Sequence, residues 1–150
     1  MMPAGDIEAC LQSEGTVIVP VFGTSMQPLL FEGRSSVLLT AYRGAPLKKG
    51  AIVLYRHRDG RLILHRIWKV THGDLYLLWG DHRWTLDEPV PGEQILAVAQ
   101  ELFLDGRPID QTAWRYRLYE KLWNGNRMIR RICLAGLRMT GLEKKQIKNE

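Results

Sequence analysis

The feature that most constrains the fold is a series of short apolar, β-branched runs, each bounded by glycine, proline or aspartate turn signals. Runs of this type cover residues 16–22, 36–42, 51–56, 61–70, 75–79 and 94–104. Turn dipeptides such as Asp59-Gly60 and Asp105-Gly106 follow them. Many short strands closed by tight turns are typical of an all-β sandwich or a partly open barrel rather than of alternating strands and helices.

The remaining segments predict helices at the two ends of the chain. Residues 6–13 predict a short helix ahead of the first strand. From residue 111 onward, apolar residues recur at three- and four-residue steps, with a break near residues 124–126, which predicts two amphipathic helices. For a chain of 150 residues, we therefore expect a mainly β fold: a β-domain over residues 1–110 and a helical extension over residues 111–150.

The charge is distributed unevenly between these two parts. Residues 111–150 hold 10 Lys and Arg against 3 Asp and Glu, a net charge of +7, whereas residues 1–110 hold 11 against 13, a net charge of −2. Basic amphipathic helices that carry Trp114 and Trp123 leave three roles open: packing on the β-domain, docking a partner, or peripheral contact with an anionic membrane. Nucleic-acid binding is disfavoured, because the β-domain is acidic and shows no recognition motif.

Other sequence signals bear on the compartment and on cofactors. No apolar run approaches the ~18 residues of a membrane span, and the first residues lack the pattern of a secretory signal, so we expect a cytoplasmic protein. Cys10 and Cys133 lie outside any ligand or redox spacing and are interpreted as free thiols. The four histidines show no ligand spacing, so we expect no metal and no organic cofactor.

Two residue positions suggest acyl-transfer chemistry. Ser25 follows the first β-type run, in the bend Gly-Thr-Ser-Met-Gln-Pro, and His65 lies within the fourth run. A histidine can accept the proton of a serine hydroxyl as its oxygen attacks a carbonyl carbon. Each residue also has an ordinary structural interpretation, since Ser25 suits a turn or helix cap and His65 suits a strand core. Lys69 shares the predicted face of His65 but is not favoured as an alternative base.

A third segment supplies carboxylates that could support such a histidine. The run ending at Trp79 is followed by a turn with Asp81 and Asp87, six residues apart. A histidine is a better base when a carboxylate holds its other ring nitrogen and stabilises the imidazolium.

Four short motifs together resemble, in order and spacing, those of type I signal peptidases and the related LexA-type peptidases. They are Gly-x-Ser-Met-x-Pro at residues 23–28, Lys-Gly-Ala-Ile-Val at residues 49–53, His-Arg-Ile at residues 65–67, and Gly80-Asp81 with Asp87. The resemblance covers roughly residues 16–100. Most bacterial members use a lysine base, whereas the endoplasmic-reticulum and archaeal-like branch uses histidine, and this chain has His65 at that position.

The resemblance implies a role for each of these positions. Ser25 would be the nucleophile, His65 the general base and Asp87 the acid that orients it. The Ser25 backbone N–H would form part of an oxyanion hole, and Gly23 and Asp81 would have supporting roles. The residues after Gly80-Asp81 depart from the family pattern, because His82 and Arg83 stand where asparagine is usual.

The expected function is therefore a serine endopeptidase of this superfamily that processes a precursor or leader peptide. Its substrate would be a peptide or protein. Two alternatives stay open: a catalytically idle member that binds peptides or membranes, and a self-cleaving protein of LexA type. For self-cleavage, Ala4-Gly5 is the pair of small residues upstream of Ser25 that could serve as a cleavage site.

Overall fold

The structure is a computed structural model that describes residues 4–125 and 127–139, without the side chains of residues 127 and 137–139. The chain divides into two compact units, Met1–Asp110 and Gln111–Glu150.

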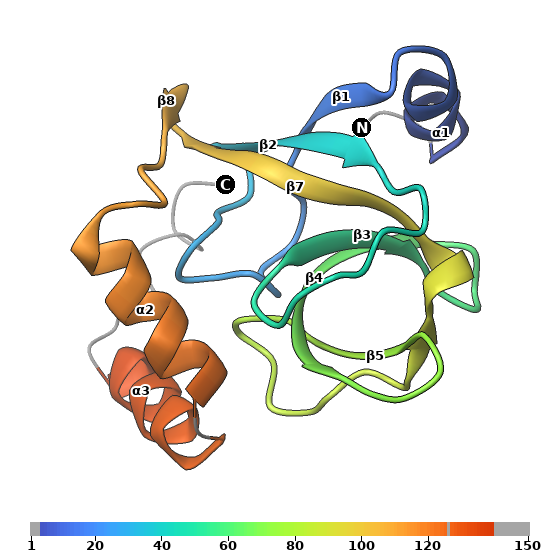
Figure 1. The fold of residues 1–150 in the computed structure, drawn as a ribbon. Coiled ribbons are helices and arrows are strands. Elements are labelled where there is room, and N and C mark those ends of the chain that lie inside the picture. Colours follow the sequence, from blue (N-terminus) through green and yellow to red (C-terminus); the bar gives the residue numbers. More distant parts are fainter. Residues whose placement is uncertain (1–3, 126, 140–150) are drawn as a thin grey trace. The chain divides into compact units, whose positions relative to one another are not determined.

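The first unit is an antiparallel sheet that curves into a half-barrel (Figure 1). Along its main path the strand order is β1-β2-β7-β3-β4-β5-β6, and β8 pairs with β7. Helix α1 precedes the strands and packs against β1, β2 and β7. The elements are α1 (Ala4–Ser13), β1 (Thr16–Pro20), β2 (Ser35–Ala41), β3 (Ile52–Arg56), β4 (Leu62–Val70), β5 (Leu75–Trp79), β6 (Val90–Pro91), η1 (Gly92–Gln94), β7 (Ile95–Leu104) and β8 (Arg107–Pro108). The prediction of a mainly β fold is confirmed.

Strand boundaries follow the β-type runs of the sequence closely. The first strand ends at Pro20, two residues before the end of its run, and Gly23 then adopts a positive φ of 74°. The sequence pattern does not indicate β6 and β8, since a two-residue strand is too short to show a period of two.

The core of this unit belongs to the part of the sheet formed by β3 to β7. It is built from buried side chains of β3, β4, β5, β6 and β7, namely Val53, Tyr55, Ile67, Tyr76, Leu78, Val90 and Ile95. In β4 three consecutive residues, His65, Arg66 and Ile67, are buried, so both faces of the sheet are covered there. A register shift between Ile67 and Lys69 interrupts the alternation, and Lys69 is exposed.

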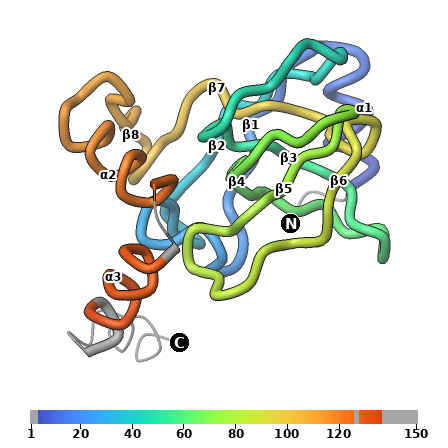
Figure 2. The backbone as a smooth tube through the Cα atoms, turned by 60° about the horizontal axis from the view of Figure 1, so that its bottom comes forward, coloured from blue at the N-terminus to red at the C-terminus, as the bar shows by residue number. Residues whose placement is uncertain are grey.

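The connection from β5 to β6 is the longest between two neighbouring strands of the β3–β6 region and spans residues 80–89 (Figure 2). It folds back along β5, because the N–H of Asp87 donates a hydrogen bond of 3.0 Å to the carbonyl oxygen of Leu78. This connection carries the residues that the sequence analysis singled out after Trp79.

The second unit contains two helices, α2 (Trp114–Gly125) and α3 (Arg127–Met139), which pack against each other. The break between them falls within the segment that the sequence pattern predicted. Over the described residues, none of the helices combines the length and the apolar character that crossing a membrane requires.

Candidate active site

Ser25 lies in a tight turn of the connection between β1 and β2. The N–H of Gln27 donates to the carbonyl oxygen of Thr24 at 3.1 Å, and the N–H of Leu30 donates to that of Met26 at 2.9 Å. The side chains of Met26 and Leu30 are buried and anchor the turn in the core. Ser25 itself is only half-buried, so the turn presents its side chain while its neighbours hold the backbone.

His65 lies on β4, opposite Val53 of β3, and its side chain is fully buried. Its Nδ1 contacts the carboxylate of Asp87, which the β5–β6 connection brings back from 22 residues further along the chain. Among the residues that the structure describes, Nε2 of His65 has no hydrogen-bond partner. One ring nitrogen of His65 thus contacts a carboxylate, and the other makes no hydrogen bond with a described residue and can accept a proton.

Tyr55 is the aromatic neighbour of this pair. Its ring centroid is 6.2 Å from that of His65. Burial, and then the negative charge of Asp87, raise the pKa of the Tyr55 hydroxyl. That hydroxyl makes no hydrogen bond of normal length and angle with any described residue, so we assign Tyr55 an electrostatic and packing influence only.

Gly80 lies next to both the Ser25 turn and the His65 ring. A Cβ atom at this position would lie 2.7 Å from Nε2 of His65 and 2.8 Å from the carbonyl oxygen of Ser25, closer than real Cβ contacts. The N–H of His82 donates to that same carbonyl oxygen at 2.8 Å. The absence of a side chain at Gly80 therefore lets the Ser25 turn and the His65 ring approach one another.

The two aspartates of the β5–β6 connection have different partners. Asp81 is completely buried and forms a two-pronged ion pair with Arg66, with distances of 3.0 Å to Nε and 2.9 Å to Nη2. Arg66 also donates from Nη1 to the carbonyl oxygen of Gly50 at 2.9 Å. Asp87, not Asp81, is the carboxylate in contact with the imidazole.

Ser25 and His65 line one groove of about 570 Å³. The rest of its lining is mainly apolar and comes from α1, from the end of β1, and from β3 and β4. These apolar residues include Ala4, Ile7, Val19, Val21, Phe22, Met26, Leu54, Leu62 and Leu64. The charged side chains in the lining are Arg61 and Arg83. The sequence pattern did not indicate that either residue would line a groove.

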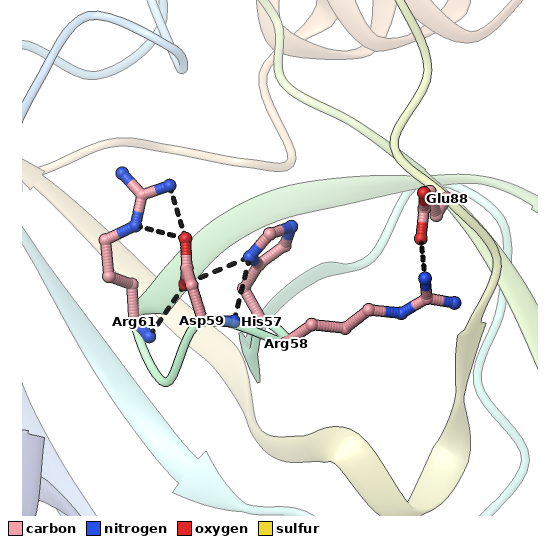
Figure 3. Close-up of polar contacts among 5 residues, drawn as sticks. All are labelled: His57, Arg58, Asp59, Arg61 and Glu88. Carbon is pink, nitrogen blue, oxygen red and sulfur yellow. Dashed lines mark hydrogen bonds and ion pairs between the residues drawn. The ribbon is translucent and has the colours of Figure 1, made fainter.

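The hairpin turn between β3 and β4 contributes Gly60 and Arg61 to the groove lining. Figure 3 shows the polar contacts of this turn. Arg61 donates from Nε to Asp59 at 2.8 Å, and this interaction holds the pKa of Asp59 well below its usual range. Arg58 pairs at 2.6 Å with Glu88, the residue after Asp87. The Arg58–Glu88 pair connects the hairpin to the loop that carries the Asp87 carboxylate.

The structure thus brings together Ser25, His65 and Asp87, and it places Asp81 in a separate ion pair. It does not bring Lys69 to them. Sequence reasoning missed Arg66, although an arginine inside an apolar strand is a signal that a buried acid must pair with it. No known protein-family model matches the chain, and no curated protein matches it.

Proposed function

We propose that this protein is a serine endopeptidase in which Ser25 is the nucleophile, His65 the general base and Asp87 the residue that orients the base. One observation carries the proposal: a buried histidine holds a carboxylate on Nδ1 and lines, with Ser25, the same groove. A histidine that merely filled the core would need neither an available Nε2 nor a neighbouring serine.

The reaction follows from the roles of the two ring nitrogens. As the Ser25 oxygen attacks the carbonyl carbon of the scissile bond, its proton passes to Nε2 of His65. The imidazolium, stabilised by Asp87, then gives that proton to the leaving amine as the C–N bond breaks. Water attacks the acyl-enzyme by the same route and restores the serine. The Ser25 hydroxyl is not hydrogen-bonded to Nε2 in this structure, and catalytic contacts of this kind commonly tighten only with substrate bound.

The groove suits an extended peptide. It is mainly apolar, and β1, which contributes to its wall, lies at one edge of the sheet. An edge strand offers backbone N–H and C=O groups to a further strand, so a substrate segment could add to β1 while its side chains occupy the groove. We infer that the substrate is a precursor or leader peptide, in keeping with the resemblance to signal peptidases.

Two other functions remain as alternatives that experiments separate. An idle peptide-binding member would keep the groove without turnover. Self-cleavage at Ala4-Gly5 is favoured by one observation, since Ala4 lines the groove. These residues are, however, in the first turn of α1, and that turn would have to unwind to present an extended scissile bond. Incubation of the intact protein followed by mass measurement tests this alternative directly.

Asp87→Asn is expected to lower turnover on the order of 10³-fold, because the amide no longer stabilises the imidazolium and can favour the wrong tautomer. The measurement is the rate at which each purified variant hydrolyses a peptide that the wild-type protein cleaves. Glu88→Gln is the matched control, since Glu88 is adjacent but exposed and paired with Arg58. Equal loss in both variants would mean that the loop, rather than the His65 contact, matters.

Gly80→Ala is expected to lower turnover about 10²-fold, because the added methyl group displaces either the His65 ring or the Ser25 carbonyl. Gly5→Ala is the control, as a Cβ there meets no atom within 4 Å. The assay is the same peptide hydrolysis, with circular dichroism to compare folding. A fully active Gly80→Ala protein would show that the Ser25 turn and the His65 ring need not approach as closely as they do here.

A further inference from the structure

Helix α2 has apolar side chains on two different faces. Tyr116 and Trp123 are buried on one of them. Trp114 and Leu118, which are one helical turn apart, project on another face and are 69% and 48% exposed. A helix that served only to pack within its own fold would need a single apolar face.

Helix α3 shows the same arrangement. Leu134 is buried, whereas Met128 and Ile132 are 66% and 65% exposed, and Ile129 beside them is also exposed. Spacings of three and four residues place these three side chains on one face of the helix. The described chain has nine exposed large apolar side chains, and five of them come from these two helices.

Basic side chains accompany these exposed apolar faces. On α2, Arg117 and Lys121 flank Trp114 and Leu118 on one side, and the Arg115 guanidinium lies 5.5 Å from the centre of the Trp114 ring. On α3, Arg131 is exposed next to Ile132. Glu120 is the one acidic residue in the described part of the second unit.

We propose that the exposed faces of α2 and α3 bind the surface of an anionic lipid bilayer. The apolar side chains would enter the boundary between headgroups and acyl chains, while the arginines and the lysine contact lipid phosphates. A second copy of this chain is a poorer occupant, because two such basic surfaces repel each other. Nucleic acid would match the charge but would leave the isoleucines and Met128 in water. The proposal does not depend on peptidase activity.

The test is flotation of the full chain with phosphatidylcholine vesicles that contain or lack about a third phosphatidylglycerol. We expect binding to the anionic vesicles that weakens as salt rises, since exposed charges are screened over about 10 Å at 0.1 M. Binding that is equal on both vesicle types, or no binding at low salt, would overturn the proposal.

Substitutions test whether the exposed faces of α2 and α3 form the lipid-binding surface. Ile129→Ser combined with Ile132→Ser is expected to weaken binding at least tenfold, because both changes remove apolar area that would be buried in the bilayer. Val70→Ser with Leu75→Ser is the matched control, as both residues are exposed apolar side chains of the sheet. Arg115→Glu with Arg117→Glu should also weaken binding. Arg43→Glu, a change at an exposed arginine of the first unit, should not.

Three results would contradict the lipid assignment. The first is vesicle binding that the α3 variant leaves intact, and the second is equal loss in the control on the sheet. The third is a wild-type dimer in size-exclusion chromatography that the same α3 variant converts to a monomer, since a second copy would then cover this face. Because the substituted side chains are exposed, circular dichroism should show the folded protein in every case.

Discussion

Ser25→Ala is expected to abolish covalent labelling by a fluorophosphonate probe and to lower peptide hydrolysis by at least about 10⁴-fold. The probe forms a bond with an activated serine oxygen, and Ser25 is the serine that shares a groove with the available Nε2 of His65. Removing the oxygen takes away the bond-forming atom but no packed group, since Ser25 is only half-buried. The variant should therefore unfold at the wild-type denaturant concentration.

Ser13→Ala is the matched control for this experiment. Ser13 is exposed at the end of α1, where its hydroxyl donates to the carbonyl oxygen of Ala9 at 2.9 Å. The Ser13→Ala variant should react with the probe to the same extent as the wild-type protein. If the wild-type protein does not react with the probe, or if Ser25→Ala keeps full hydrolysis, the proposed nucleophile is wrong and the peptide-binding alternative becomes the better account of the groove.

Asp81→Asn is expected to lower the free energy of unfolding by about 3–5 kcal/mol, because it leaves the Arg66 guanidinium buried without its counter-charge. Both side chains are completely or almost completely inaccessible to water, so solvent cannot replace the lost partner. Urea unfolding followed by tryptophan fluorescence measures the change.

Asp105→Asn is the control for this prediction. Asp105 pairs with Arg34 on the surface, where both side chains are about half exposed, and the change should scarcely affect stability. A second variant tests the cause: Arg66→Met with Asp81→Leu should be more stable than Asp81→Asn, because it removes the buried charge together with its partner. If Asp81→Asn unfolds like wild type, the ion pair has no net stabilising effect.

The sequence predicted the parts of the site that depend on local signals. The turn residues around Ser25, the β-type run that contains His65 and the Gly-Asp turn after Trp79 each leave a pattern in a short window. The order of these motifs, through their resemblance to a known family, selected Asp87 over Asp81 as the partner of His65. In the structure, Nδ1 of His65 contacts the carboxylate of Asp87, whereas Asp81 pairs with Arg66.

The missed parts depend on contacts between segments far apart in the chain. Arg66 lies one residue from His65, yet its partner Asp81 could be found only by knowing that β5 pairs with β4. The need for Gly80 to lack a side chain arises because the Ser25 turn and the His65 ring meet beside it. A contact of this kind leaves no periodic pattern of apolar residues in the sequence. Likewise, nothing in residues 4–13 indicated that α1 would supply part of the groove wall.

His65 and Arg66 are adjacent on β4, so their side chains leave the strand on opposite sides, and each takes its carboxylate from the same connection. Five residues separate Asp81 from Asp87. That short stretch of backbone must pass from one side of the strand to the other, and its length is set by the distance it covers. Related chains should therefore vary in the composition of this stretch while keeping its length, because one residue inserted or deleted there would separate one of the two carboxylates from its partner.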